Sequence, residues 1–375
     1  MRKNSAIMFF VVLLYIAHAQ EIWNGEIDTD WYFNNQYETE FTINSAEELA
    51  GLAMLASSEI NFEGKTVILG QNIVLNDTVN WKGWINSPPA NINKWIPIGP
   101  NNTLLFNGTF DGNGHVISGI YINDPANDRQ SLFGYLGTNG EIKNLGVTAS
   151  YIKGDYYAGG LVGWNSGEIN GCYSSAWVFG GMFFTGGLVG RNSGGTIHNS
   201  YSIGTVKGEN FVGGIAGQIE GGAIINSYSV SEVTGTGSSV GGLVGGIHAN
   251  GGTITNSYYN LADMTFEDFE GWDFDNIWGI DDKVNNGYPY LLWSAKTSNI
   301  RLPQIAGSQI NIKTIGNAIV LENLPKNAKI KIYNLQGKRI YSAHPENPKI
   351  LRILVQTKGV YIMKAGTQIF RITIK

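Results

Sequence analysis

A glycine motif recurs through the middle of this chain at nearly constant spacing. The motif reads GG[LI][VA]G, and its four full copies begin at residues 159, 186, 213 and 241, at intervals of 27, 27 and 28 residues. A degenerate earlier copy occupies residues 132–134. Repeats of this length are typical of stacked proteins, in which each copy buries its apolar side chains only against its neighbours. The repeat therefore predicts a solenoid over residues 131–260.

The residues between the glycine motifs predict short strands. Apolar and polar residues alternate with period two in residues 196–202, as in a half-buried strand. This alternation places Ile197, Asn199 and Tyr201 on one face, and His198, Ser200 and Ser202 on the other. When the copies are aligned, isoleucine, leucine and valine form apolar columns: Ile169, Ile197, Ile224 and Ile254; Leu161, Leu188, Ile215 and Leu243; Val178, Val206 and Val233. We expect these columns to be stacked coils of β-structure.

A third column contains asparagine, at Asn199, Asn226 and Asn256, with Gly171 in the first full copy. Stacked asparagines can pass amide hydrogen bonds from one layer to the next, which predicts an amide ladder along the solenoid. The paired glycines suit turns where φ is positive or where two backbones approach closely. The period-three glycine of collagen is absent, and the many apolar residues argue against disorder.

The N-terminus has the layout of a secretory signal peptide. Arg2 and Lys3 precede an apolar run of about a dozen residues, and Ala17-His18-Ala19 supplies an A-x-A cleavage site. The apolar run is shorter than the ~20 residues that a membrane-spanning helix needs. Residues 1–19 are therefore predicted to be removed on secretion. A capping box at Ser45–Glu48, followed by leucines at helical spacing, predicts a helix that covers the first coil.

Charge divides the chain near residue 300. Residues 20–300 hold 28 acidic and 10 basic residues, whereas residues 301–375 hold 2 acidic and 13 basic ones. The basic residues of the tail alternate with Ile, Val and Tyr, which indicates the solvated face of a small β domain rather than a nucleic-acid surface. The acidic body also argues against nucleic acid as a partner.

The repeat resembles the GLUG-motif family of bacterial surface proteins. The GG[LI][VA]G copies carry the resemblance, together with the leading segment WIPIG…FNGTFDGNGHVISGIYI (95–122) and the exit segment GWDFDNIWGI…NGYPYLLW (271–293). The resemblance covers most of residues 42–293. It implies a right-handed parallel β-helix and a role at the cell surface, often in adhesins, and it implies no enzymatic activity.

The last 75 residues resemble a type IX secretion C-terminal sorting domain in the segments KIKIYNLQGK (329–338) and KGVYIMK (358–364). This resemblance implies a small β-sandwich that the type IX secretion machinery recognises, and hence an outer-surface or secreted location in a Gram-negative bacterium. The chain then divides into five parts: a signal peptide (1–19), an N-terminal cap with the leading coils (20–130), the repeat β-helix (131–260), a C-terminal cap of the solenoid (261–298) and the sorting-like β-sandwich (299–375).

No catalytic or metal-binding set emerges from the sequence. Its histidines form no H-E-x-x-H motif, no G-x-S-x-G elbow occurs, and the lone Cys172 is more often inert than reactive in such a setting. Asp111-Gly112-Asn113-Gly114 is interpreted as a tight turn rather than a calcium loop. We therefore expect no catalytic residues, no metal and no cofactor. The alternative is a β-helix polysaccharide lyase or glycoside hydrolase, which needs paired carboxylates; Asp155 and Glu209 are predicted to lie two coils apart, separated by Met182.

Ligand binding has better support from the sequence. Three aromatic residues stand in columns that are mostly polar in the other copies, and these columns are predicted to face outward: Trp164, Trp177 and Phe183. Exposed aromatics that cluster on one or two copies suggest a stacking platform for a sugar or a peptide. The alternative is that a flanking loop covers them. The sequence thus predicts a secreted or cell-surface, non-enzymatic adhesion or binding protein whose partner is an extracellular glycan or protein surface.

Overall fold

The computed structural model describes residues 21–259 without a gap. Beyond them it describes 269, 271–280, 284–285, 288–294, and the segments 311–315, 318–322, 330–334, 339–343, 350–355, 359–365 and 368–374. The predicted signal peptide lies outside the described residues. Among the residues that are described, no helix is long and apolar enough to cross a membrane.

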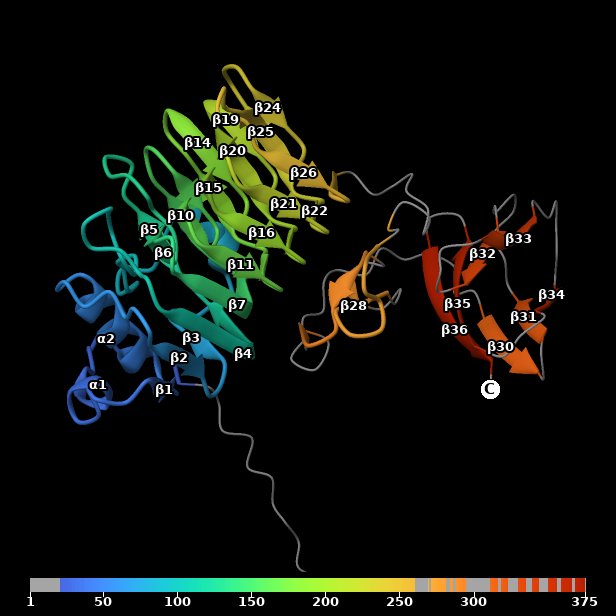
Figure 1. Cartoon of the computed structure of the whole chain (residues 1–375), viewed down its shortest axis with the longest axis horizontal. Helices are drawn as coiled ribbons and strands as arrows, with labels where there is room; N and C mark the ends of the chain where they lie inside the picture. The colour runs from blue at the N-terminus through green and yellow to red at the C-terminus, as the bar shows by residue number, and fades with distance from the viewer. Residues whose placement is uncertain are drawn as a thin grey trace, which may run out of the picture.

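The central architecture is a parallel β-solenoid whose coils stack along one axis (Figure 1). Eight strands pair in parallel, one from each coil, which gives the solenoid its eight layers: β1 (Glu40–Ile43), β2 (Thr66–Leu69), β4 (Thr109–Ser118), β7 (Glu141–Thr148), β11 (Glu168–Asn170), β16 (Thr196–His198), β21 (Ala223–Ile225) and β26 (Thr253–Thr255). The repeat predicted from the glycine motif therefore extends toward the N-terminus through layers that lack the motif.

Each repeat coil contributes further short strands to four other stacks. The stack that follows the first one along the chain contains β3 (Ile73–Val74), the second halves of β4 and β7, β12 (Tyr173–Ser174), β17 (Tyr201–Ser202), β22 (Tyr228–Ser229) and β27 (Tyr258–Tyr259). The next contains β5 (Tyr121–Asn123), β8 (Tyr151–Lys153), β13 (Trp177–Phe179), β18 (Thr205–Gly208) and β23 (Glu232–Gly235).

The last two stacks flank the glycine motif. One contains β9 (Ala158–Gly159), β14 (Phe183–Gly186), β19 (Asn210–Gly213) and β24 (Val240–Gly241). The other contains β6 (Phe133–Leu136), β10 (Val162–Asn165), β15 (Val189–Ser193), β20 (Ala216–Glu220) and β25 (Val244–Ile247). The predicted apolar columns are confirmed in the inner coils. Ile169, Ile197 and Ile224 are directly paired and fully buried, and Leu161, Leu188 and Ile215 are fully buried in the same core.

The paired glycines are required by close backbone approach and not by positive φ. None of the pairs 159–160, 186–187, 213–214 and 241–242 has a positive φ. A Cβ atom on Gly186 would lie 1.9 Å from the carbonyl oxygen of Val189, and one on Gly187 would lie 2.3 Å from that of Gly214 in the next coil. Any larger residue would therefore clash with the backbone of its own coil or of the next one.

The predicted faces of residues 196–202 are wrong after Asn199. This residue has a φ of 50°, so its left-handed backbone interrupts the strand and reverses the alternation. Ser200 and Ser202 therefore point inward, while Tyr201 lies on the outer side in a separate cluster. The same left-handed position recurs in every neighbouring coil, and we call these residues the asparagine corner: Asn113, Asn144, Gly171, Asn199, Asn226 and Asn256.

The asparagine column is explained by backbone conformation rather than by an amide ladder. Asparagine and glycine are the residues that enter the left-handed region at least cost. Asn199 donates to Asn170 of the preceding coil (3.1 Å) instead of to another corner residue, and Oδ1 of Asn226 has no partner among the described residues. An amide bond between coils does occur elsewhere, because Asn165 donates to Asn192 across 2.6 Å.

Serines support the chain just after the asparagine corner. The hydroxyl of Ser200 donates to the carbonyl of His198 (2.8 Å) and accepts the N–H of Cys172 from the preceding coil (3.1 Å). Ser227 repeats both bonds one coil later, and accepts the N–H of Ser200. These bonds satisfy buried backbone groups where the β-ladder is interrupted. Cys172 fills the same column as a buried thiol.

A helix closes the first coil, as predicted. In α2 (Ala46–Ala56) the hydroxyl of Ser45 accepts the N–H of Glu48, and the Glu48 carboxylate accepts the N–H of Ser45, both across 3.1 Å. Leu49, Leu52 and Leu55 are buried in the solenoid core. Figure 1 shows α2 at the N-terminal end of the stack, beside the short helix α1 (Asp30–Phe33). A 3₁₀ helix, η1 (Trp81–Ile85), lies in a long excursion before β4.

The exit segment packs against the side of the solenoid. It contains a small antiparallel pair, β28 (Trp278–Gly279) and β29 (Tyr290–Leu291). Trp272, Trp278 and Leu291 cover the outward tyrosines, which stack face to face at 5.0 Å from Tyr173 to Tyr201 and from Tyr201 to Tyr228. The described exit residues thus cover a lateral tyrosine face, and Ile254 in the last coil is 39% exposed.

The C-terminal part forms two antiparallel sheets among its described residues. One sheet has the order β30 (Asn311–Ile315), β31 (Ala318–Glu322) and β34 (Ile350–Leu354). The other has the order β33 (Arg339–Ala343), β32 (Ile330–Asn334), β35 (Gly359–Ala365) and β36 (Gln368–Ile374). The all-β character predicted for this part is therefore present.

Candidate functional site

A second left-handed corner in the coils is occupied by aromatic residues. Tyr157, Phe184 and Phe211 have φ values of 60°, 64° and 54° in three successive coils. Arg129 and Ser239 hold the same position in the coils before and after them, with φ values of 56° and 65°. A bulky residue with positive φ is a genuine outlier. The left-handed conformation costs a residue with a Cβ roughly 1–2 kcal/mol.

The last glycine of the motif explains how this corner is held. A Cβ atom on Gly190 would lie 2.5 Å from the carbonyl carbon of Tyr157, and one on Gly217 would lie 2.6 Å from that of Phe184. The corner backbone of one coil therefore presses directly on the glycine of the next. The N–H of Tyr157 also donates to the carbonyl of Phe183 across 3.1 Å. The left-handed turn in one coil therefore requires the last glycine of the motif in the next coil.

The corner rings contact one another along the solenoid axis. The centroid of Phe184 lies 5.2 Å from that of Tyr157, nearly parallel to it, and 5.2 Å from that of Phe211. The guanidinium of Arg129 lies 5.2 Å from the centre of the Tyr157 ring. All four side chains are half-buried. Each ring contact adds about 0.5–1.5 kcal/mol, so these contacts and the backbone strain roughly offset each other.

Trp164 begins a parallel column beside this corner. Its ring stacks on Tyr135 at 5.7 Å, meets Tyr157 edge-on at 5.0 Å and lies 4.7 Å from the guanidinium of Arg191. Arg191 also lies 5.1 Å from the Phe184 ring and forms an ion pair with Glu220. The arginine therefore ties the two columns together. Gln218, which follows Arg191 in the column and was expected to face outward, is buried.

Phe183 extends the same surface on its other side. It contacts Phe184 (5.7 Å), Tyr156 (5.7 Å) and Phe211 (6.1 Å). Two of the predicted binding residues, Trp164 and Phe183, are thus joined through shared neighbours. We call this surface the aromatic corner, and it comprises Arg129, Tyr135, Tyr156, Tyr157, Trp164, Phe183, Phe184, Arg191 and Phe211.

Trp177 lies apart from the aromatic corner. It projects from β13, where its ring contacts Trp81 (5.2 Å) and Phe179 (6.4 Å), and Lys82 lies 5.9 Å from it. Trp81 and Lys82 belong to η1, so a flanking segment partly covers Trp177, as the alternative interpretation expected. Trp177 remains half-buried and stays a separate prediction.

Sequence reasoning missed most members of the aromatic corner. Tyr157, Phe184 and Phe211 each stand two residues before the first glycine of a motif copy. An aromatic at the same offset in three successive copies was a readable signal. The left-handed backbone of these residues could not be predicted, because no propensity rule places a bulky aromatic residue at positive φ.

The carboxylates beside the aromatic corner are engaged in hydrogen bonds, and the buried thiol lies elsewhere in the coil. Asp155 accepts the N–H of Met182 (3.2 Å), and Glu209 accepts an amide N–H of Asn210 (3.1 Å). The residue pairing keeps these carboxylates two coils apart, as predicted. Burial raises the pKa of the Cys172 thiol to about 12, so it is a poor nucleophile. No group of three or more His, Cys, Asp or Glu that could hold a metal occurs in the described part of the chain.

Comparison with known proteins identifies the repeat. The family model of the GLUG motif matches residues 154–178 and 185–207. A protein of Evansella cellulosilytica described as a "putative Gly-rich membrane protein" is 39% identical over 79 residues, which are 20% of this chain and 9% of that protein. Halomucin of Haloquadratum walsbyi is 37% identical over 79 residues, which are 21% of this chain and 1% of halomucin. The chain thus spans a small fraction of these relatives.

A solved structure from Bacteroides ovatus, described as a "putative immunoglobulin A1 protease", aligns with a TM-score of 0.44 at 20% identity. The alignment covers 68% of this chain and 93% of that one. The GLUG match begins just before β9, ends in β18 and includes four residues of the aromatic corner: Tyr156, Tyr157, Trp164 and Arg191. The chain accordingly carries GLUG-motif repeats, at residues 154–178 and 185–207, within a parallel β-solenoid.

Proposed function

We propose that this chain is a secreted or cell-surface protein without enzymatic activity, which binds a partner through the aromatic corner. The observation that carries the proposal is the left-handed backbone of Tyr157, Phe184 and Phe211. Three successive coils place a large ring where asparagine or glycine would be less strained. Strained conformations of this kind cluster at sites that serve function. The rings are half-buried and therefore accessible.

The arrangement favours a protein surface over a glycan as the partner. A sugar ring stacks on the face of an aromatic ring, but the faces at this corner are turned toward one another, as in the parallel pairs Tyr157–Phe184 and Tyr135–Trp164. The edges of the rings and the arginine side chains are therefore the groups that a partner could contact. Tryptophan, tyrosine and arginine are also the residues that dominate binding energy at protein interfaces. Glycan binding at this corner is the competing outcome.

A screen against host matrix proteins and glycans, repeated with single alanine variants, tests the proposal. Trp164→Ala and Phe183→Ala should weaken binding by about 2 kcal/mol or more, with little change in melting temperature. Trp177→Ala, measured in the same screen, tests the separate prediction at β13, and weaker binding by this variant would extend the binding surface to that residue. Large losses of melting temperature in Trp164→Ala and Phe183→Ala would show that the rings are structural, and the proposed binding surface would be wrong.

The enzyme alternative is a β-helix polysaccharide lyase or glycoside hydrolase. Product analysis in the same screen separates it from a binder, because a lyase releases unsaturated sugars and a hydrolase releases shortened ones. We expect bound glycans or proteins to be recovered intact. Appearance of a cleaved product that depends on Asp155 or Glu209 would overturn the non-enzymatic assignment.

We further propose that the C-terminal part is a β-sandwich that directs export through the type IX machinery, after removal of the signal peptide at residues 1–19. In support, both C-terminal sheets contribute to one buried cluster, with Ile319 and Ile353 from the first sheet and Ile332 and Met363 from the second. Two sheets that share a core in this way are typical of a sandwich. Truncation after Ser298 should leave the protein in the periplasm of a Gram-negative host; unchanged surface display would contradict the proposal.

A further inference from the structure

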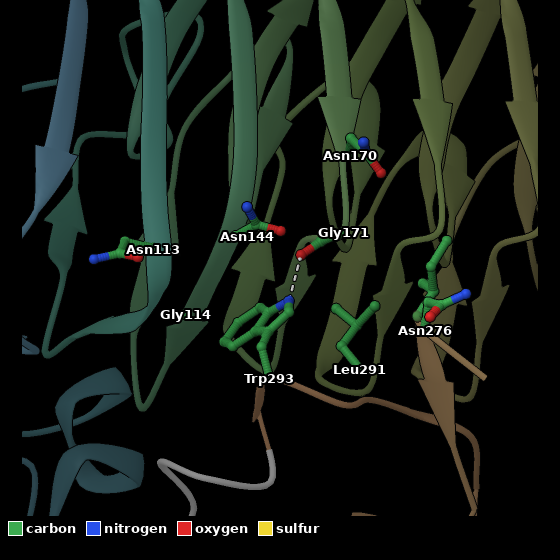
Figure 2. A pocket seen from close by; sticks show the side chains of 9 residues that line it. Asn113, Gly114, Asn144, Asn170, Gly171, Asn276, Leu291 and Trp293 are labelled. Atoms are coloured by element: carbon green, nitrogen blue, oxygen red, sulfur yellow. Dashed lines mark hydrogen bonds between the residues drawn. The ribbon is translucent and has the colours of Figure 1, made fainter. Parts of the chain in front are cut away.

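A cavity of about 410 Å³ lies between the asparagine corner and the exit segment (Figure 2). Asn113, Asn144 and Gly171 line it from three successive coils, and Asn170 lies beside them. Trp293 and Asn276 line it from the exit segment. The volume falls in the range of small-molecule sites, which is roughly 300–1,000 Å³. This cavity differs from the aromatic corner in its side chains, because four asparagine amides contribute to its wall.

Gly171 opens the cavity. The corner position before it is Asn144 and the one after it is Asn199, so this coil replaces an asparagine by glycine while keeping the left-handed φ of 63°. A Cβ atom on Gly171 would point toward Oδ1 of Asn144 at 3.3 Å and Nε1 of Trp293 at 3.9 Å. The indole N–H donates to the Gly171 carbonyl across 3.1 Å, which fixes the ring at the cavity wall.

The cavity wall is uncharged and mixes asparagine amides with the apolar side chains of Ile277, Leu291 and Trp293. None of the described residues that line it is acidic or basic. An ionic ligand would lose its hydration without gaining an ion pair, which disfavours charged ligands. Several amide atoms remain available. Nδ2 of Asn144 is held by Asp111 and Oδ1 of Asn170 by Asn199.

Four amide atoms in the wall have no hydrogen-bond partner among the described residues: Oδ1 of Asn113, Oδ1 of Asn144, Oδ1 of Asn276 and Nδ2 of Asn170. The site thus presents three acceptors and one donor beside an indole ring. A ligand that matches it must supply several donors within a small volume and accept at least one bond. The hydroxyls of one sugar ring do so, since each can both donate and accept.

We propose that this cavity binds a neutral saccharide ring. The proposal does not rest on the aromatic corner, which concerns a different surface. Trp293 would bound the sugar on one side, while the amides of Asn113, Asn144, Asn170 and Asn276 would bond its hydroxyls. Gly171 is then the residue that makes room for the ligand, and its departure from asparagine has a functional reason.

Saturation-transfer NMR on the full chain tests the proposal. The probes are glucose, galactose, mannose, N-acetylglucosamine and their disaccharides, with glucuronic acid as the anionic counterpart and acetylated, amidated trialanine as a neutral peptide. Gly171→Asn keeps a residue that tolerates the left-handed turn but fills the cavity. Asn226→Gly is the matched control, because it makes the reverse exchange at the same corner outside the cavity. Trp164→Ala removes the aromatic corner instead.

We expect at least one neutral saccharide to bind the natural chain, Asn226→Gly and Trp164→Ala alike, and to lose about tenfold or more in affinity in Gly171→Asn, a change of about 1.4 kcal/mol. Circular dichroism should show that Gly171→Asn remains folded. Three results would overturn the proposal: no neutral saccharide binds, binding survives Gly171→Asn, or glucuronic acid or the peptide binds better. Loss of saccharide binding in Trp164→Ala alone would move the glycan site to the aromatic corner.

Discussion

Two left-handed corners recur in every repeat coil of this solenoid, and they are occupied by opposite kinds of residue. At the asparagine corner φ runs from 45° to 63° from Asn113 to Asn256, and every position is asparagine or glycine. At the aromatic corner φ runs from 54° to 65°, yet the positions hold Arg129, Tyr157, Phe184, Phe211 and Ser239. Both corners require a positive φ, but only the asparagine corner is occupied by residues that adopt it readily.

The difference in residue type between the two corners distinguishes residues that the backbone conformation requires from residues that it only accommodates. Backbone conformation alone accounts for the residues of the asparagine corner, since asparagine and glycine carry the smallest left-handed penalty. It cannot account for three large rings at the other corner. Their contacts with one another roughly offset the strain, so stability gives little reason to keep them. We therefore propose that these rings serve binding, and the following predictions test the contrast between the two corners.

Removal of a whole coil should preserve both corners, whereas removal of half a coil should destroy them. Deletion of residues 186–212 joins Thr185 to Gly213 and leaves each stack in register, so we expect a soluble, β-rich protein. Deletion of residues 186–199 removes the corner residue Asn199 and joins Thr185 to Ser200, so the strands that follow fall out of register. We expect no cooperative unfolding transition for this variant. Circular dichroism and thermal melts measure both. Equal loss of folding in the two deletions would contradict the solenoid account.

The buried thiol and tyrosines that follow the asparagine corner should make the fold less stable at high pH. Burial raises the pKa of Cys172 from 9.0 to about 12 and raises the pKa values of Tyr173, Tyr201 and Tyr228. The folded chain therefore holds these protons longer than the unfolded chain. These four groups should lower the free energy of unfolding as the pH rises through 9 toward 12, by up to ~4 kcal/mol for the thiol alone.

Urea unfolding between pH 8 and pH 12 measures this decline. Cys172→Ser is the matched variant, since serine occupies this column in the next three coils, and it should show a smaller decline that begins above pH 10. An equal stability at pH 8 and pH 11 in the natural chain would show that these groups are not held in the neutral form.

Loss of a serine behind the asparagine corner should cost more than loss of the thiol. Ser200→Ala leaves the buried N–H of Cys172 without its acceptor and should cost about 1–3 kcal/mol. Cys172→Ser restores the residue type of the column and should change stability by only a few tenths of that. Urea titration at pH 7 compares the two. A similar cost for both variants would mean that packing, rather than these hydrogen bonds, stabilises the column.

Much of the solenoid could be predicted from residue patterns. The isoleucine and leucine columns, the capping box of α2 and the glycine motif all express packing that leaves a regular spacing in the sequence. The outward tyrosines could not be placed, because the alternation was carried through Asn199 as if the strand continued. The left-handed turn there changes which side chains face the core.

The candidate site was predicted in part. Trp164 and Phe183 stood out as aromatics in polar columns, and they do lie on one half-buried surface. Tyr157, Phe184 and Phe211 were overlooked, because a column of aromatics looks like core. The cavity at Gly171 was likewise invisible, since Trp293 and Asn276 reach it from more than 100 residues away in the sequence.

Substitutions at the asparagine corner should follow backbone preference. Asn199→Ala leaves the left-handed region to a residue without the local side-chain hydrogen bonds that let asparagine tolerate it, and should cost up to roughly 1–2 kcal/mol. Asn199→Gly should cost no more than a few tenths of this. Thermal melts of both variants provide the measurement. If alanine and glycine prove equivalent, the corner residue is chosen for its side chain, and the contrast between the two corners disappears.

The most direct test of the central claim is Phe184→Asn, which places the residue of one corner in the other. Asparagine relieves the strain but removes the ring from contacts with Tyr157 and Phe211. We therefore predict a change in unfolding free energy of less than about 1 kcal/mol, together with loss of partner binding, when melting and affinity are measured on the same sample. A loss of 3–5 kcal/mol, as expected for truncation of a core phenylalanine, with the affinity of the remaining folded protein unchanged, would contradict the claim.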